Sequence, residues 1–373
     1  MFRSSWYLFL LSINLLQAQS FIIKSNPSKE TSLQANMGLD MKTIQYNENK
    51  SGEDFTSVMQ MSNQPIPKAK PGIAVVKVMA AASNPIDFKV MGGFLTGAGW
   101  SMPFPFVVGY DFSGVIYDIS SEDAEAFPKD TNVFGVQWGQ GKHDEEDQPV
   151  GGAFAEYIAV PVSRLSVKPD AISHELAAAS ALVGTTAHQI VNQCANVQKD
   201  EKVLILGGAT SVGMIAVQLA LQNGAKVWTT ASPRNKEFVE SLGDVNIINY
   251  RQDKWWEMDD VQNIDAVIDT TGEEGGWEHA QKVLKADGSF VSIAAFDVGF
   301  DPSGHAPKKY AAFHCLANDP VVQNEIAQAL ANGKLKIPLV EPFYSFTEQD
   351  AKDMLAAQAK GAHTGKLVMS ISN

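Results

Sequence analysis

The sequence predicts an α/β protein in which a doubly wound parallel sheet follows a separate β-rich unit. Between residues 202 and 296, apolar runs of strand length alternate with amphipathic helical segments. Strands that are buried on both faces of a parallel sheet produce this pattern. Between residues 41 and 168, strand signals recur with Gly and Pro at their corners. The texture changes near residue 173, and we expect the second unit to begin there.

The β-rich unit contains four groups of strand signals. MKTIQY alternates like an edge strand, and GIAVVKVMAAASN is typical of a longer strand that leads into a turn at NPID. Two further β-rich stretches follow, each with Gly or Pro at its corners. The four groups lie at 41–46, 72–84, 104–120 and 152–169.

An Ala-rich helix is expected over 173–195, with Ser173 at its start, and a βα series follows it. Crossovers between parallel strands are right-handed, so ligands should bind outside the carboxyl ends of these strands. The expected strands lie at 202–208, 225–232, 246–250, 265–272 and 289–296, and the expected helices at 211–224, 234–243 and 275–288.

A glycine-rich corner joins the first strand of this series to its helix. Gly208, Thr210 and Gly213 fall on the spacing G-x-G-x-x-G, with threonine in the middle position. Glycines allow a tight turn, a close approach of a diphosphate and close packing of helix on strand, and the helix N-terminus attracts the anion. We therefore expect a Rossmann dinucleotide site, the alternative being a purely structural turn. The candidate residues are Gly208, Ala209, Thr210, Ser211, Val212 and Gly213.

The end of the second strand indicates which dinucleotide binds. An NAD site would place Asp or Glu there, to accept a hydrogen bond from the ribose 2′-hydroxyl. Ser232, Arg234 and Lys236 stand there instead. A hydroxyl and two cations suit a 2′-phosphate, which arginine binds with a planar fork. NADPH is favoured over NADH, against the alternative of a basic helical turn exposed to solvent.

The amino-acid composition limits the classes of ligand that the protein could bind. The formal net charge is −13 and no basic stripe is present, which argues against duplex nucleic acid, whose binding needs clustered Lys and Arg. A small-molecule partner is favoured. The chain has two cysteines, Cys194 and Cys315, which exclude a disulfide framework and a Cys-rich zinc module.

The first 36 residues are interpreted as a targeting segment. Arg3 precedes an apolar run at 6–16 that suits a signal-peptide core and is too short to span a bilayer. Phe21 then opens a polar stretch rich in Ser, Lys and Asn. This combination resembles the bipartite plastid-import presequences of algae with secondary plastids; the ER or secretion is the alternative. No stable membrane span is expected.

Ordered landmarks along the chain resemble the zinc-independent, quinone oxidoreductase-like branch of the medium-chain dehydrogenases/reductases. They include KVMAAASNPIDFKVMGG, PFVVGYDFSGVI, the glycine corner and HTGKLVMSI, while RNKEFVESLG is similar to plastid-envelope and ene-one reductase members. The resemblance covers nearly everything from 41 to 373, and Thr210 departs from the glycine usual in the family. It implies a GroES-like catalytic domain that is discontinuous in sequence, over 41–172 and 333–373, with the Rossmann domain at 173–332 between.

The resemblance also bears on metal. Zinc-dependent relatives hold catalytic zinc with a cysteine in the early turn and a histidine in a Gly-His-Glu element. Asn84 and Tyr110 occupy these places, and the four clustered cysteines of the structural zinc lobe are missing. Since neither place offers a soft ligand, we expect no metal site.

Without metal, the expected chemistry is hydride transfer from NADPH to a quinone or to the β-carbon of an α,β-unsaturated carbonyl compound. The resemblance puts Asn84 and Thr186 near the nicotinamide and its ribose, where they would fix the ring or steady an enolate. The alternatives are an Asx-turn and a helix-interior hydroxyl. Tyr110 is expected either to donate a proton or to line the pocket. Asp87 and Asp111 are expected to cap turns beside the cleft.

Three further positions follow from the resemblance. Tyr250 ends the third strand and either flanks the 2′-phosphate or packs in the fold. Gly272 lets the adenosine pass over the fourth strand, or is an ordinary turn glycine. Lys366 in HTGK resembles a cofactor-facing lysine, the alternative being a solvent-facing one.

Two other functions compete with the quinone or enone reductase. One is a trans-enoyl reductase acting on carrier-bound acyl chains, and the other is a non-enzymatic NADP(H)-binding or redox-sensing protein. Relatives are often dimers, so a homodimer is possible.

Overall fold

The computed structural model describes most of the chain beyond the predicted presequence. Residues 1–36 and Cys315 lie outside the described ranges, so the structure does not bear on them. The described ranges are 40–97, 102–137, 152–294, 309–312 and 319–372.

The β-rich part forms a mostly antiparallel sheet that includes strands from both ends of the described chain. Its order is β15-β16-β3-β5-β6-β8, with β7 also paired to β3. β16 runs antiparallel to β3, with Val368 opposite Ala82. The C-terminal segment therefore completes the first sheet, as expected for a GroES-like unit that is discontinuous in sequence. The strands are β3 (Ile73–Ala82), β5 (Asp111–Asp118), β6 (Asn132–Val136), β7 (Tyr157–Pro161), β8 (Ser166–Val167), β15 (Tyr344–Ser345) and β16 (Val368–Ser370).

A smaller sheet of order β2-β1-β4 accompanies it. Beyond the end of β3, Asn84 lies at the corner where helix α2 begins, and Pro85 holds the first helical position, which suits proline because it lacks an N–H. The elements are β1 (Asp40–Tyr46), β2 (Met59–Pro65), β4 (Phe106–Val107), α2 (Pro85–Met91) and α3 (Phe94–Gly97).

The second sheet is parallel and has the order β11-β10-β9-β12-β13-β14. The direction of winding reverses between β9 and β12, and in such sheets the crevice at this point takes the ligand. This is the doubly wound arrangement that the βα series predicts. The strands are β9 (Lys202–Leu206), β10 (Lys226–Ala231), β11 (Val245–Asn249), β12 (Ile264–Asp269), β13 (Leu284–Ser292) and β14 (Lys309–Ala312).

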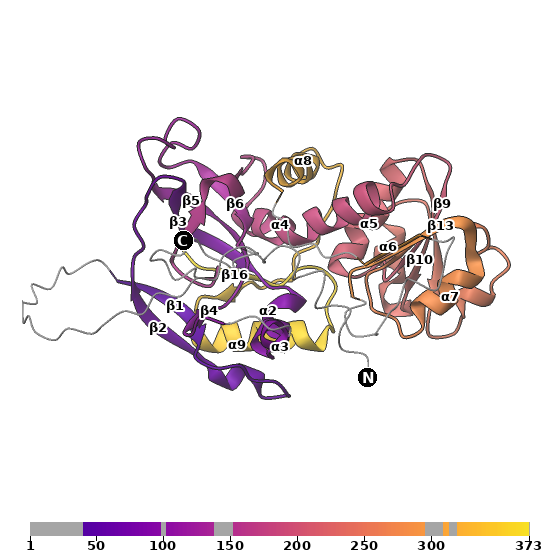
Figure 1. Ribbon diagram of the computed structural model, residues 1–373, viewed down its shortest axis with the longest axis horizontal. Helices are drawn as coiled ribbons and strands as arrows, with labels where there is room; N and C mark the ends of the chain where they lie inside the picture. The colour runs from indigo at the N-terminus through magenta and orange to yellow at the C-terminus, as the bar shows by residue number, and fades with distance from the viewer. Residues whose placement is uncertain (1–39, 98–101, 138–151, 295–308, 313–318, 373) are drawn as a thin grey trace, which may run out of the picture. The chain divides into compact units, whose positions relative to one another are not determined.

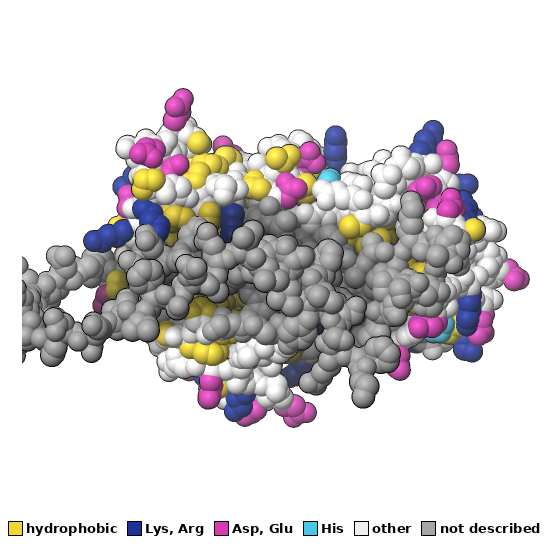
Figure 2. Space-filling view, in the orientation of Figure 1, with side chains coloured by type: hydrophobic (Ala, Val, Ile, Leu, Met, Phe, Trp, Pro, Cys, Tyr) yellow, Lys and Arg dark blue, Asp and Glu magenta, His cyan; other side chains and the backbone are white. Residues whose placement is uncertain are grey.

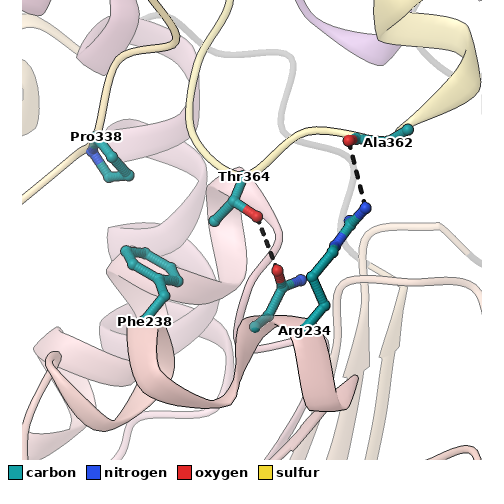
Figure 3. A pocket seen from close by; sticks show the side chains of 6 residues that line it. Arg234, Phe238, Pro338, Ala362 and Thr364 are labelled. Carbon is teal, nitrogen blue, oxygen red and sulfur yellow. Dashed lines mark hydrogen bonds between the residues drawn. The ribbon is translucent and has the colours of Figure 1, made fainter.

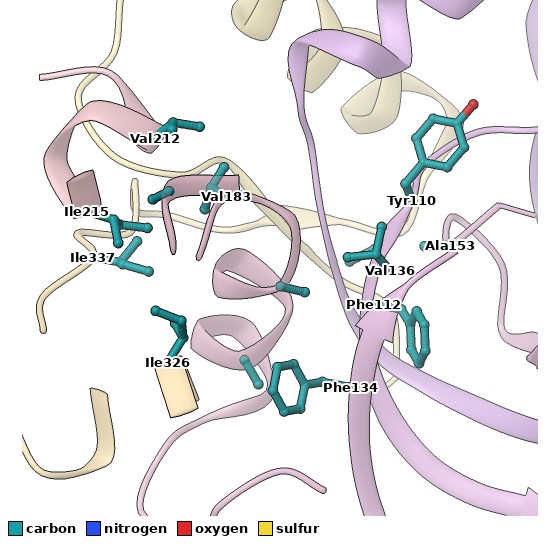
Figure 4. Close-up of a cluster of buried hydrophobic side chains, with 14 of the residues drawn as sticks. Tyr110, Phe112, Phe134, Val136, Ala153, Val183, Val212, Ile215, Ile326 and Ile337 are labelled. Carbon is teal, nitrogen blue, oxygen red and sulfur yellow. The ribbon is translucent and has the colours of Figure 1, made fainter. Parts of the chain in front are cut away.

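Helix α4 (His174–His188) links the core of the first sheet to the helices of the second. It begins at Ser173, whose hydroxyl accepts a hydrogen bond from the N–H of Leu176. It packs against β3, β5 and β6, and also against α5 (Ser211–Gln222) and α8 (Pro320–Ala331) (Figure 1). Figure 4 shows the shared buried cluster, in which side chains of β5 and β6 and those of α5 lie around α4. The site is thus built on one continuous core.

Two expected helices are shorter than the sequence pattern indicates. The helix predicted over 275–288 ends at Val283 as α7 (Gly276–Val283), because Leu284 pairs with Ile264 and begins β13. The helix predicted over 234–243 is a 3₁₀ turn followed by α6 (Lys236–Glu240). Pairing in the sheet overrides helical periodicity in the first case.

The C-terminal helix α9 (Glu348–Lys360) begins at Thr347 and ends at Gly361, which adopts the left-handed conformation. In the described ranges, no helix combines the length and the apolar character that a bilayer crossing needs. Figure 2 shows acidic and basic side chains interspersed over the described surface of one face.

Candidate active site

The corner after β9 requires glycine at two adjacent positions for different reasons. Gly207 has φ +89°, a left-handed conformation that side chains other than glycine rarely adopt. A Cβ atom on Gly208 would lie 2.4 Å from the Thr229 hydroxyl oxygen. The spacing G-x-G-x-x-G predicts the tight turn at Gly208, its first glycine, but in the structure Gly207 takes the left-handed conformation. Two consecutive glycines in the sequence could have indicated this turn, but the G-x-G-x-x-G spacing includes only Gly208.

Thr210 caps the helix that follows the corner. Its hydroxyl oxygen accepts a 2.9 Å hydrogen bond from the N–H of Gly213 and lies 2.8 Å from the hydroxyl of Thr270. Threonine is a favourable N-cap residue because it satisfies one of the orphan N–H groups of the first turn. The hydroxyl is therefore engaged in the cap and with the neighbouring strand end.

The remaining groups at this helix end suit a diphosphate. Ser211 and Val212 open α5, and their N–H groups have no acceptor among the described residues. A Cβ on Gly213 would come within 2.0 Å of the Gly207 carbonyl oxygen, so only glycine lets the helix start this close to the turn. Free N–H groups at a helix N-terminus attract anions. The corner therefore fits the phosphates of a dinucleotide.

The ends of β10 and β11 lie side by side because these strands are parallel neighbours. Ser232 follows β10 and is buried, whereas Arg234 and Lys236 are exposed. Tyr250 follows β11 with 53% of its surface exposed, so the packing alternative for this residue is wrong. The Arg251 guanidinium lies 6.0 Å from the centre of the Tyr250 ring. Sequence reasoning missed Arg251, although it directly follows Tyr250 at the strand end.

A cavity of about 440 Å³ lies beside Arg234 (Figure 3). The Nη1 atom of Arg234 donates to the Ala362 carbonyl oxygen at 3.5 Å, and the Thr364 hydroxyl donates to the Asn235 side-chain oxygen at 2.9 Å. The second-sheet region and the C-terminal segment therefore meet through polar contacts here. The lining residues are Arg234, Asn235, Phe238, Pro338, Ala362 and Thr364.

The loop after β12 is held by Asp269. One of its carboxylate oxygens accepts hydrogen bonds from the N–H groups of Thr271 and Gly272, and the other accepts from the Ser292 hydroxyl. Gly272 has φ +72°, so glycine is required by the backbone. Gly272, which the resemblance places beside the adenosine, therefore lies in a fixed turn.

A buried polar cluster forms where three distant segments meet. Lys366 has 2% of its surface exposed, and its Nζ donates to the Ser83 carbonyl oxygen at 2.8 Å, to Asn84 Oδ1 at 2.6 Å and to Asp111 Oδ2 at 3.3 Å. Asn84 Nδ2 donates to the same carboxylate oxygen at 2.8 Å. The solvent-facing alternative for Lys366 is therefore wrong, and its three N–H groups all meet protein oxygens.

The carboxamide of Asn84 is engaged with Lys366 and Asp111, while the backbone carbonyl oxygen of Asn84 accepts from the N–H of Asp87. Asp111, expected to cap a turn, is instead the anion of a buried ion pair, and its other oxygen accepts from the N–H of Leu182 in α4. Burial lowers the pKa of Lys366 and raises that of Asp111, and the attraction between the two opposes both shifts.

Asp87 lies next to this cluster. Its Oδ2 accepts a 2.6 Å hydrogen bond from the backbone N–H of Asn84, which is the turn-capping role expected of it. Its Oδ1 is buried and has no hydrogen-bond partner among the described residues. Burial raises the pKa of Asp87 to about 8; the Asn84 N–H opposes this shift, and the nearby Asp111 adds to it. A protonated carboxyl avoids an unpaired buried charge.

Tyr110 is buried, and its ring lies in the cluster drawn in Figure 4. Burial, followed by the charge of Asp87 and by Tyr46, holds the pKa of Tyr110 well above its usual value. Sequence reasoning missed Tyr46, whose buried hydroxyl makes no hydrogen bond within the described ranges. A phenol of raised pKa is a weaker acid, so this environment disfavours proton donation by Tyr110.

Thr186 lies on α4 and has 5% of its surface exposed. It follows Leu182 by four residues and therefore shares a helix face with it. The backbone N–H of Leu182 donates to Asp111, so α4 contacts the buried polar cluster one turn before Thr186. That Thr186 acts together with Asn84 stays a prediction.

Metal-ligating side chains do not gather in the described part of the chain. No group of three His, Cys, Asp or Glu residues there could hold a metal ion. Asn84 and Tyr110, at the places of the zinc ligands in zinc-dependent relatives, are an amide already bonded to an ammonium and a buried phenol. These residues do not fit a catalytic zinc.

Two family models match the chain. Residues 70–170 match the alcohol dehydrogenase GroES-like domain, and residues 242–369 match the zinc-binding dehydrogenase model. The second model is named for zinc binding, but the described residues of this chain contain no group of side chains that could hold a metal ion.

Curated relatives and a solved structure match over most of the chain. A 2-methylene-furan-3-one reductase of Solanum lycopersicum is 30% identical over 91% of this chain and 81% of its own length. An NADPH-dependent alkenal/one oxidoreductase, chloroplastic, of Arabidopsis thaliana is 29% identical over 83% of this chain and 74% of its own length. The quinone oxidoreductase of Coxiella burnetii superposes with a TM-score of 0.74 at 28% identity, over 89% of this chain and 100% of that one. The chain belongs to the medium-chain dehydrogenase/reductase family of oxidoreductases.

Proposed function

We propose that the protein is an NADPH-dependent, zinc-free oxidoreductase that delivers hydride to a quinone or to the β-carbon of an α,β-unsaturated carbonyl compound. The observation that carries the proposal is the corner before α5, where Ser211 and Val212 offer N–H groups at the point where the winding of the sheet reverses. The names of the tomato and Arabidopsis relatives support the substrate class.

The residues of the corner and of the neighbouring strand ends are proposed to hold NADPH, which supplies the hydride when bound. Ser211 and Val212 would donate to the diphosphate, and Gly208, Ala209 and Gly272 would lie along the cofactor as small residues of the strand ends. Ser232, Arg234, Lys236 and Tyr250 would surround the 2′-phosphate. Arg234 is suited to this because its only protein hydrogen bond in the described ranges is a long one of 3.5 Å.

The proposed catalytic group is the carboxamide of Asn84, and Thr186 of α4 is proposed to assist it. An N–H donor of Asn84 would stabilise the negative charge that builds on the substrate oxygen as its β-carbon accepts hydride. Tyr110 is a poor proton donor for the reasons given above. Solvent is therefore proposed to protonate the product.

The positive charge beside Asn84 disfavours zinc binding. The Lys366 ammonium already lies against Asn84 Oδ1 and Asp111, so a divalent cation would meet a fixed positive charge there. Full activity of metal-free protein after dialysis against a chelator is expected. Loss of turnover on chelation with recovery on adding zinc would overturn this part.

A panel of substrates tests the reaction. Oxidation of NADPH should occur with quinones, enals or enones. Turnover only with acyl thioesters would indicate the trans-enoyl reductase, and NADPH binding without turnover would indicate a redox-sensing protein.

Cofactor choice has its own test. Arg234→Ala should raise the Kd for NADPH about tenfold and leave that for NADH unchanged, since only NADPH carries the 2′-phosphate. Lys334→Met, which changes an exposed lysine, is the matched control. Equal effects on both cofactors would contradict the assignment.

Plastid targeting by residues 1–36 is also proposed, with support from the chloroplastic relative of Arabidopsis. A fluorescent protein fused to residues 1–40 should enter the plastid; secretion of the fusion would contradict this. The domain boundaries at 172 and 333 and the homodimer stay predictions. Limited proteolysis and light scattering, respectively, would check them.

A further inference from the structure

We propose that Lys366 and Asp111 are positioning residues that lock the carboxamide of Asn84 in one orientation, so that Asn84 presents an N–H rather than its carbonyl oxygen to the substrate. This inference rests on the proposed reductase function and explains how the Asn84 amide is oriented in that site. Lys366 would thus act by orienting Asn84, and not by contacting the cofactor directly.

The chemistry of the two partners allows only one orientation of the amide. An ammonium has three donors and no acceptor, so only the carbonyl oxygen of Asn84 can face Lys366. Asp111 as a carboxylate only accepts, so only the NH₂ group can face it. The observed distances are 2.6 Å from Lys366 Nζ to Asn84 Oδ1 and 2.8 Å from Asn84 Nδ2 to Asp111 Oδ2. A flipped amide would exchange two charge-assisted hydrogen bonds for two repulsive contacts.

The lock is itself held rigid. Lys366 also donates to the Ser83 carbonyl oxygen, and the second oxygen of Asp111 accepts from the Leu182 N–H. Exposure of the three locked side chains is between 0% and 2%. Water therefore does not compete for these bonds, and in such surroundings they are strong.

One N–H of Asn84 is left over by this arrangement. Nδ2 carries two hydrogens, of which one goes to Asp111, and the other has no acceptor among the described residues. The ammonium on Oδ1 draws electron density from the amide and strengthens this donor. A free, polarised and preoriented N–H is the group that a developing oxyanion requires.

A double-mutant cycle tests the proposal with Asn84→Ala, Lys366→Met and the two combined. Lys366→Met should lower kcat about tenfold or more in the wild-type background, and less than about twofold when Asn84 is already alanine. Lys366→Arg keeps the cation but is larger and planar, so it should retain more activity than Lys366→Met and less than the wild type. Equal losses in both backgrounds would show that Lys366 acts directly on cofactor or substrate, and would overturn the proposal.

Binding and melting provide readouts besides turnover. The Kd for NADPH, measured by its fluorescence, should change less than about twofold in Lys366→Met if the lysine acts through Asn84. A Kd that rises as much as kcat/KM falls would overturn the proposal. The Tm losses of Lys366→Met and Asn84→Ala should be non-additive because the residues share hydrogen bonds; additive losses would count against the lock.

Two outcomes need further controls: a variant that does not fold, and a wild-type protein that turns over no substrate. Where Lys366→Met fails to fold, Lys366→Met/Asp111→Asn removes both charges together; it should fold and show the same loss of kcat, and undiminished kcat would overturn the lock. Where the wild-type protein turns over no member of the panel, the reductase function fails. The melting-temperature cycle then still decides whether the amide is locked.

Discussion

The corner before α5 and the buried polar cluster at Asn84 are built in opposite ways. The corner is made from seven consecutive residues, Gly207 to Gly213, and its geometry is set by backbone conformation and by missing side chains. The cluster is made from side chains that are far apart in sequence: Lys366 and Asn84 are separated by 282 positions. One region is local and carries its donors on the backbone, whereas the other depends on the whole fold.

This difference determines how each region responds to change. A local backbone corner fails by steric clash and tolerates loss of a polar side chain. A buried cluster tolerates changes of shape better than loss of one charge, because the partner is then left unpaired in a place without water. Substitutions of each kind should therefore separate the two regions.

The largest effect is expected from Lys366→Met. Removing the ammonium leaves the Asp111 carboxylate buried without its cation, and breaking a buried pair in this way costs about 3–5 kcal/mol of the free energy of unfolding. Urea denaturation measures it. The double variant Lys366→Met/Asp111→Asn should lose less than the sum of the single losses, and the exposed Lys334→Met almost nothing. A loss below about 1 kcal/mol for Lys366→Met would mean that the cluster is not a charged pair.

Gly213→Ala should come next, at about 3 kcal/mol, because overpacking against main chain forces backbone shifts. Its Cβ would come within 2.0 Å of the Gly207 carbonyl oxygen. Gly276→Ala is a matched control, since its Cβ would meet its nearest neighbour at 3.7 Å. Urea denaturation of both variants checks this, and equal stabilities would contradict the steric account of the corner.

The sequence predicted the corner well for the same reason. A strand, a glycine pair and a helix are contiguous, so their arrangement could be read without knowing the rest of the fold. What the pattern missed was which glycine takes the left-handed conformation, because Gly207 and Gly208 are equivalent in composition. The cap formed by Thr210 was within reach of sequence reasoning, since threonine directly before a helix is a known signal.

The cluster shows where prediction from one sequence stops. Asn84, Asp111 and Lys366 were each singled out, but not as partners, because nothing local to Asn84 indicates Lys366. A lysine is normally expected at the surface, so its burial could not be predicted from its residue type. The pairing of β16 with β3 brings Lys366 to the site. The helix predicted over 275–288 failed for a related reason, since Leu284 pairs with a strand 20 positions earlier in the chain, at Ile264.

Asp87 gives the cluster a distinct pH dependence. Its pKa is about 8 in the folded protein, against 3.8 for the unperturbed group, so the folded state binds more protons between these values. Stability then falls as pH rises through this window, by about 1.4 kcal/mol per pH unit at most for one proton. The corner contains no titratable group and contributes no such slope.

Asp87→Asn removes the contribution of Asp87 to the pH dependence of stability, because asparagine mimics the protonated carboxyl and does not titrate. Relative to the wild type, the variant should gain about 2.6 kcal/mol in unfolding free energy between pH 5 and pH 7. Urea denaturation at several pH values measures the difference. A constant difference across the range would show that Asp87 is ionised in the folded protein.

The smallest effect is expected at Thr210, where the corner depends on a side chain. Thr210→Ala removes the acceptor for the Gly213 N–H and should cost about 1 kcal/mol, whereas Thr210→Gly should cost only a few tenths, since glycine is nearly as good an N-cap. Thermal denaturation of the two variants ranks them. The Ser211 and Val212 donors are not touched by either change, so the Kd for NADPH should stay within about twofold of the wild-type value in Thr210→Gly. A glycine variant that is less stable than the alanine variant would show that the hydrogen bond between Thr210 and Thr270, rather than the cap, holds the corner to β12.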